Sequence, residues 1–321
     1  MNSKWYGNIG KIVIPTPFAV GNVNAYVIKS DVLTLIDAGP KTDEAWEAMK
    51  SGLSHLGYCP EDIEQVVLTH HHPDHAGLLD YFSHEVPVYG HSYNQDWLLR
   101  TEAFFKRHDD FYAELFLELG LPQQFLIFLD RLRAPLKWMC QRTLTGVLQE
   151  GDAIPGLQEW KVIETLGHAQ SHLSFYREKD GVLIAGDHLI AHISSNPLIE
   201  PAEQMEQERP MPQVQYNASL RKMLEYDISL AFSGHGSEIN AVHELVNRRL
   251  ERQHVRAMKV RDMLVEEPKS CFDICQKLFP EIFKKELGLT MSETLGQLDY
   301  LLDVGEVSVT HNEYGVAMYS A

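Results

Sequence analysis

The alternation of strand-like and helix-like segments in the first 240 residues predicts an α/β fold. Short runs rich in β-branched and aromatic residues predict strands. A helix is expected after Gly39 and Pro40, where Thr42 can serve as the N-cap, and it should end near residue 55. We expect strands at residues 12–15, 24–28, 32–37, 63–69, 86–90, 160–165, 172–177, 182–186 and 228–233.

A helical insertion is expected at about residues 101–145, between two strand-rich halves. From Phe104 to Leu119, apolar side chains recur at helical spacing and form one broad stripe. Pro122 and its neighbours end that helix, and a second apolar helix is expected over 123–139. The stripe favours core packing, on the host domain or on another subunit, over a lid beside a substrate. A solvated helix face and an anionic substrate explain the insertion's cations equally well: Lys106, Arg107, Arg131, Arg133 and Lys137.

After residue 240 the alternation stops, and a second domain is expected over 241–321, beside a domain of residues 1–240. A long polar helix should cover 243–265. Helices at 272–279, 283–287 and 291–304 and a hairpin of 307–310 and 314–319 should follow, an order that suggests a small winged-helix-like domain. The last of these helices carries Glu293, Asp299 and Asp303 but no Lys or Arg, whereas a helix that reads DNA needs cations. We therefore expect this domain to serve packing or homodimer formation.

Charge and composition limit the classes of partner and the location that we expect for this protein. The 321 residues include 28 Lys and Arg against 45 Asp and Glu, a net charge of -17, which disfavours nucleic acid and anionic membranes. No apolar run approaches the ~20 residues that cross a bilayer, and the N-terminus lacks the apolar core of a signal peptide. The four cysteines match neither a disulfide scaffold nor a zinc ribbon, and Cys271 and Cys275 are expected in the core. We expect a cytoplasmic protein that acts on a small molecule.

The segment T-H-H-H-P-D-H-A-G, residues 69–77, concentrates metal-binding side chains. It offers His70, His72, Asp74 and His75 directly after a buried strand. Imidazole and carboxylate suit zinc, and also iron or manganese. Three further candidates, His168, Asp187 and His235, each follow a predicted strand and stand next to a glycine. The sequence therefore predicts a metal site built from strand ends.

This pattern, H-x-H-x-D-H followed by single His, Asp and His positions, resembles the metallo-β-lactamase fold superfamily, and within it the glyoxalase II-like hydrolases. The resemblance covers about residues 10–240 without the insertion. It implies an αββα sandwich with two divalent metal ions, zinc before iron or manganese, at one edge between the sheets. It also implies that Asp37 supports the loop of residues 69–77, here called the histidine loop. One ion would lie on His70, His72 and His168, and the other on Asp74, His75 and His235, with Asp187 as the bridge.

The implied reaction is hydrolysis. Two cations about 3.5–4 Å apart share a water, lower its pKa and generate a hydroxide that attacks a carbonyl or phosphoryl centre. Asp74 is expected to orient the hydroxide and to move a proton to the leaving group. An ester, thioester or lactone fits the acidic chain and the apolar insertion best.

Other reactions and a non-enzymatic role stay open. The C-terminal segment also resembles the winged-helix tail of superfamily members related to a mitochondrial endoribonuclease, so phosphodiester cleavage is the main alternative. An iron-dependent sulfur dioxygenase is another, although such relatives bind one iron or replace a ligand. β-Lactam hydrolysis is disfavoured without a signal peptide, and a binding module without activity is disfavoured because no ligand is missing.

Several polar residues beside the ligands have weaker expected roles. His71 is expected to face solvent or to support its neighbours. His172 and His188 are expected either to line the pocket or to hydrogen-bond a ligand. Substrate contact is weighed equally against ordinary loop polarity for His192, Ser194 and Asn196.

Overall fold

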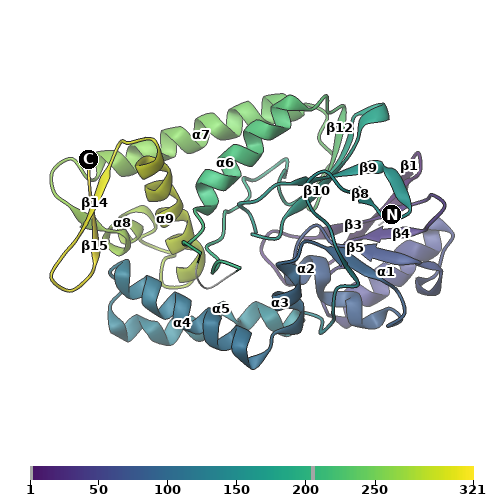
Figure 1. Ribbon diagram of the computed structural model, residues 1–321, viewed down its shortest axis with the longest axis horizontal. Helices are drawn as coiled ribbons and strands as arrows, with labels where there is room; N and C mark the ends of the chain where they lie inside the picture. Colours follow the sequence, from purple (N-terminus) through teal and green to yellow (C-terminus); the bar gives the residue numbers. More distant parts are fainter. Residues whose placement is uncertain (1–2, 204–206) are drawn as a thin grey trace.

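The computed structural model describes residues 3–203 and 207–321. The molecule is elongated, with two β-sheets at one end and the C-terminal helices at the other (Figure 1). The N-terminus lies beside the sheets, and the C-terminus lies at the far end.

The first sheet has seven strands in chain order, β1 to β7. Strands β1 to β4 pair antiparallel, and β4 to β7 pair parallel. Buried residues run without alternation along the central strands β3, β4 and β5, because both faces of the sheet are covered. The strands are β1 (Ser3–Tyr6), β2 (Ile9–Ile14), β3 (Val23–Ile28), β4 (Thr34–Ile36), β5 (Gln65–Val67), β6 (Val88–Gly90) and β7 (Gly146–Val147).

The second sheet has five strands in the order β12-β11-β10-β9-β8. Strands β11 and β12 are parallel, and the other neighbours are antiparallel. The strands are β8 (Ala153–Ile154), β9 (Leu157–Glu164), β10 (Leu173–Arg177), β11 (Val182–Gly186) and β12 (Leu230–Ser233).

Three apolar layers hold the sheets and their helices together. The first lies between the seven-stranded sheet and α1 (Asp43–Leu56), which Thr42 caps as expected. The second fills the space between the two sheets around Trp160, and the third lies between the five-stranded sheet and α6 (Pro212–Lys222). These layers form the predicted αββα sandwich. Short 3₁₀ turns connect parts of it at Pro60–Asp62, Gly77–Tyr81, Glu178–Asp180 and Met223–Glu225.

The insertion is helical, but one predicted helix in it is wrong. After α3 (Asn94–Leu99), α4 (Glu102–Glu118) carries the predicted apolar stripe. Residues 123–139 do not form one helix. They form 3₁₀ turns at Gln123–Phe128 and Ala134–Trp138 around the single turn α5 (Leu129–Leu132). Pro135 interrupts a continuous helix because proline lacks a backbone N–H and its ring clashes with the preceding turn.

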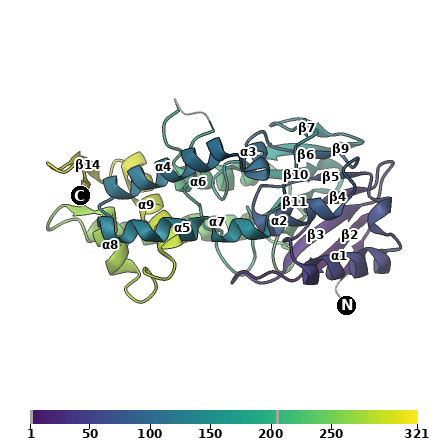
Figure 2. The same cartoon turned by 90° about the horizontal axis from the view of Figure 1, so that it is seen from below.

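The apolar stripe of α4 packs against the C-terminal part of the same chain. Tyr112, Phe116 and Leu119 share one core with the C-terminal helices, and the backbone N–H of Phe272 donates to the carbonyl of Leu119 at 3.0 Å. Figure 2 shows α4 alongside this part of the molecule. The stripe is therefore core, as expected. Homodimer formation through the insertion or the C-terminal domain stays a prediction.

The C-terminal part contains two helices and a three-stranded sheet of order β13-β15-β14. The expected helix at 283–287 is wrong. Residues 280–286 form turns, because only Phe283 reaches the core ahead of Leu287, where the next helix begins. Cys271 and Cys275 are buried free thiols, as expected. The elements are β13 (Lys269–Ser270), α8 (Cys271–Leu278), α9 (Leu287–Asp303), β14 (Ser308–His311) and β15 (Ala317–Ser320).

Helix α7 (Val242–Asp262) joins the two ends of the molecule (Figure 1). Its first turns pack Val242 and Val246 on the five-stranded sheet, and its last turns place Ala257 and Val260 in the C-terminal core. The predicted boundary at residue 240 falls just before this shared helix. No helix in residues 3–203 and 207–321 is long and apolar enough to cross a bilayer.

Candidate metal centre

The predicted ligands meet at one edge of the sandwich, where strands of both sheets end. His70 and His72 follow β5, and Asp74 and His75 lie in the single turn α2 (Pro73–Ala76). His168 lies in the β9–β10 loop, Asp187 follows β11 and His235 follows β12. Because β11 and β12 are parallel, their carboxyl ends bring the last two residues to the same edge.

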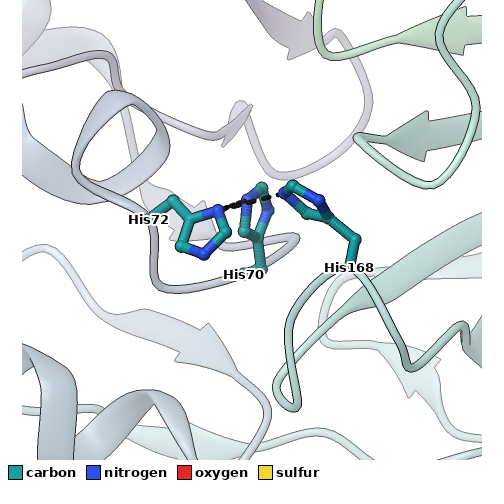
Figure 3. Close-up of side chains that lie close together, drawn as sticks. All are labelled: His70, His72 and His168. Carbon is teal, nitrogen blue, oxygen red and sulfur yellow. Dashed lines mark hydrogen bonds between the residues drawn. The ribbon is translucent and has the colours of Figure 1, made fainter. Parts of the chain in front are cut away.

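Three histidine rings form the first group (Figure 3). Nε2 of His70 lies 2.9 Å from Nδ1 of His72, which lies 3.0 Å from Nε2 of His168. Nitrogen ligands at ~2.0–2.1 Å from a tetrahedral zinc ion lie about 3.3 Å from one another. The three nitrogen atoms therefore converge as the ligands of one ion do.

A second group faces the first across Asp187. Nε2 of His235 lies 3.3 Å from Oδ2 of Asp74, and Nε2 of His75 lies 4.0 Å from the same oxygen. Asp187 contacts both groups: its Oδ1 is 3.4 Å from His75, and its Oδ2 is 3.3 Å from His235 and 3.6 Å from His168. All seven predicted side chains are thus together, with Asp187 between the two groups.

In three of the rings, Nδ1 contacts an oxygen of a supporting residue, so Nε2 faces the other candidate ligands. Nδ1 of His75 lies 2.8 Å from Oδ2 of Asp37, and Nδ1 of His235 lies 2.8 Å from the carbonyl oxygen of Asn22. Nδ1 of His168 lies 3.0 Å from the carbonyl oxygen of Asn196. Such contacts fix ring orientation and select the protonated nitrogen.

Asp37 joins β4 to the histidine loop, in the supporting position that the family resemblance implies. It has a positive φ of 60°, which is uncommon for a residue other than glycine. Its carboxylate accepts hydrogen bonds from the backbone N–H of Thr69 at 2.8 Å and from the Thr69 hydroxyl at 2.7 Å. The strand end and His75 are thereby tied to a single carboxylate.

Two neighbours confine Asp187 closely. Nε2 of His172 accepts a hydrogen bond from the backbone N–H of Asp187 at 3.1 Å. A Cβ atom at Gly234 would lie 2.0 Å from Oδ1 of Asp187, so no larger residue fits there without displacing the carboxylate. The glycine beside His235 therefore gives Asp187 its space.

Burial lowers the pKa of His70 and His168, whereas carboxylates raise the pKa of His235 against the effect of burial. Burial and the neighbouring imidazoles hold the pKa of His70 well below its usual value and lower the pKa of His168 to about 4. Burial alone would also lower the pKa of His235, but the carboxylates of Asp187 and Asp74 raise it to about 10. His70 and His168 are therefore neutral imidazoles, whereas His235 holds its proton against buried carboxylates.

Unpartnered buried atoms indicate what the centre can hold. Nε2 of His75, Nε2 of His235 and Oδ1 of Asp187 are buried without a hydrogen-bond partner. Groups of this kind are normally paired, because leaving one unpaired costs about 1–3 kcal/mol. Imidazole nitrogen and carboxylate oxygen are ligands of zinc, iron and manganese. The residues present thus fit divalent metal ions, which can take the place of the protons.

Three supporting residues were not predicted from the sequence. Ser195 Oγ lies 2.8 Å from Nδ1 of His168, and Ser171 Oγ lies 2.8 Å from Nδ1 of His71. The carboxylate of Glu200 is buried 3.2 Å from Nε2 of His71. These partners come from distant parts of the chain, and a single Ser or Glu in a loop gives no signal of its own.

The polar residues with weaker expected roles differ in their burial and contacts. His71 does not face solvent, because it is buried and stacks on Trp97 with ring centroids 4.3 Å apart. His188 is also buried, near Tyr216, and its ring contacts none of the seven residues through a hydrogen bond. His192 is exposed and Ser194 is half-buried, and their substrate contacts stay predictions.

Known proteins share this architecture. A crystal structure of the metallo-beta-lactamase family protein TTHA1429 from Thermus thermophilus superimposes with a TM-score of 0.81 at 26% identity, over 98% of both chains. A beta-lactamase domain protein from Burkholderia ambifaria has the same fold, with a TM-score of 0.76 at 21% identity, over 99% of this chain and 94% of its own. These matches include the C-terminal part, so the whole arrangement recurs.

Sequence relatives agree with the fold. The chain is 46% identical over 290 residues to the probable metallo-hydrolase YqjP of Bacillus subtilis (strain 168), a match that covers 90% of this chain and 91% of that protein. The model of the metallo-beta-lactamase superfamily matches residues 19–235, a range that contains all seven converging side chains. The chain is a metallo-hydrolase of the metallo-beta-lactamase superfamily.

Proposed function

We propose that this chain is a binuclear hydrolase of the glyoxalase II-like kind, acting on the carbonyl of an ester, thioester or lactone. His70, His72 and His168 would hold one divalent ion, and Asp74, His75 and His235 the other. The position of Asp187, whose carboxylate lies within 3.6 Å of rings in both groups, carries this proposal. Zinc is the favoured metal because histidine dominates the ligand set.

Bound ions of this kind acidify a shared water molecule and polarise a substrate oxygen. The chain's own residues supply orientation and proton transfer. The Asp74 side chain is 11% exposed. It can therefore contact water and substrate while it also contacts His235. We assign it the orientation of the attacking water and the movement of a proton to the leaving group.

We also propose a cytoplasmic location. The charge of the chain supports a small-molecule substrate over a nucleic acid. The net charge of -17 repels polyanions. Three of the insertion's cations are paired with acidic residues of the same chain: Lys106 with Asp110, Arg107 with Asp96 and Arg133 with Asp109. They are therefore less available to a phosphate backbone.

The test is a substrate panel on the full chain after metal analysis. Protein loaded with zinc is assayed against thioesters, carboxylic esters, lactones, phosphodiesters and β-lactams, with Asp187→Asn as the inactive control. We expect two metal ions per chain and turnover of a carboxylic ester, thioester or lactone that the control lacks. Phosphodiester cleavage without carbonyl hydrolysis would overturn the substrate class, and a single iron per chain would overturn the binuclear hydrolase.

A further inference from the structure

Residues 195–201, here called the crossing segment, link the metal centre to the helical end of the molecule. They form neither helix nor strand, yet Ser195, Ile199 and Glu200 are buried. Buried irregular backbone requires partners for its polar groups. In this segment those partners lie on two sides, among the metal-centre loops and on the helices.

The helical side anchors the segment through its backbone. The hydroxyls of Tyr112 and Tyr93 donate to the carbonyls of Ile199 and Pro201, and Ser292 Oγ on α9 accepts from the backbone N–H of Ile199 at 3.2 Å. The Ile199 side chain also belongs to the core shared by α4 and the C-terminal helices. The insertion and the C-terminal part thus fix where Glu200 lies.

The other side of the segment places the Glu200 carboxylate against two rings of the histidine loop. Oε1 of Glu200 lies 3.2 Å from Nε2 of His71 and 3.8 Å from Nε2 of His72. Oε2 accepts a hydrogen bond from the backbone N–H of Gln170 at 2.7 Å. Glu200 thereby contacts the loop of His70 and His72 and also the loop that carries His168.

The two ring nitrogens of His72 face different partners, and this decides which of them carries the proton. Nδ1 of His72 faces the other two rings of the first group, so Nε2 must carry the proton when Nδ1 binds a cation. On this side Nε2 faces the Glu200 carboxylate, which is only 3% exposed. The ion-pair contacts of Glu200 are with histidines, and a buried carboxylate is costly without a compensating cation. A divalent ion on the far side of the His72 ring supplies that charge.

We propose that Glu200 is a positioning residue for the ion held by His70, His72 and His168: it fixes the His72 ring and the adjoining loop through His71. The inference rests on the proposed binuclear site. Glu200 does not contact the reacting atoms, and the second ion is held by residues that Glu200 does not touch. Loss of Glu200 should therefore weaken one ion and spare the other.

The experiment compares Glu200→Gln with Glu203→Gln in the full chain. Glu203 is exposed on the same loop, so it is a matched control for the same change. Each metal-free protein is titrated with Co²⁺ while the absorption bands are recorded, and its thermal melt is measured. We expect Glu200→Gln to lose roughly 10–100-fold in affinity for one Co²⁺ ion and to change that ion's bands. The other ion and the Glu203→Gln protein should behave as wild type.

Glu200→Asp keeps the charge on a shorter side chain and serves if Glu200→Gln does not fold. It should show a smaller loss for the same ion, because its carboxylate is withdrawn from the rings. Wild-type affinity and bands for both ions in the folded Glu200 variant would overturn the positioning role. Wild-type protein that binds fewer than two Co²⁺ ions would instead contradict the binuclear site itself, so the two failures are distinguishable.

Discussion

Nδ1 of His75 lies 2.8 Å from Oδ2 of Asp37, and both side chains are buried. The same carboxylate binds the backbone and hydroxyl of Thr69. Its position at the end of β4 therefore sets both the direction of the His75 ring and the path of the chain leaving β5. The contact between Asp37 and His75 thereby orients Nε2 of His75 toward Asp187.

Replacing Asp37 with Ala should weaken the ion assigned to Asp74, His75 and His235. The His75 ring loses the carboxylate that faces its Nδ1, and loss of such a supporting group costs roughly 10–100-fold in metal affinity. Competition with a chromophoric chelator measures this change. Asp31→Ala is the control, because Asp31 is exposed. Unchanged affinity in Asp37→Ala would remove the supporting role.

Replacing Asp187 with Asn, or Asp74 with Ala, should remove most activity. Asp187 contacts both groups and Asp74 is the proposed proton carrier, so the loss should exceed the roughly 10–100-fold seen when a group only supports a ligand. Turnover on the substrate found by the panel and metal content are measured together. Near-wild-type turnover in either variant would refute its assignment.

Metal binding should release protons and tighten as pH rises. The pKa of His235 is raised to about 10 and that of His75 well above its usual value, so both are protonated at pH 7 without metal. A ligand nitrogen must lose its proton, so uptake at pH 7 should release about two protons. Between pH 7 and pH 10 the release should fall as the protons leave beforehand, and the affinity should rise. Calorimetry in buffers of different ionisation enthalpy counts the protons, and a value near zero at pH 7 would contradict this balance.

Phe116→Ala should destabilise the contact between the insertion and the C-terminal helices. Phe116 is 2% exposed in their shared core, and truncation of a buried Phe costs about 3–5 kcal/mol. Leu117→Ala is the matched control on the same helix, since Leu117 is 44% exposed and should change stability by less than about 0.5 kcal/mol. Urea unfolding measures both. Equal effects would mean that the stripe does not anchor the two parts.

The seven converging residues could be found from the sequence because the signal is local. His70, His72, Asp74 and His75 lie within one short loop, and the other three each follow a strand that its β-branched residues make recognisable. Strands β9, β11 and β12 run in the same direction, so their carboxyl ends lie at the same edge of the five-stranded sheet. The α/β class and the chemical type of the site therefore followed from short-range patterns, and the αββα sandwich from the family resemblance of the ligand pattern.

The remaining features depended on long-range contacts, which leave no local pattern. The helix expected over 123–139 is interrupted at Pro135, and the stripe on α4 packs on the C-terminal core, more than a hundred residues away in the sequence. Glu200 looks like any loop glutamate until the crossing segment places it against His71 and His72. The sequence alone determined which side chains can bind metal. The tertiary structure decided which buried carboxylate supports them, because only packing between distant segments brings that charge to the ring.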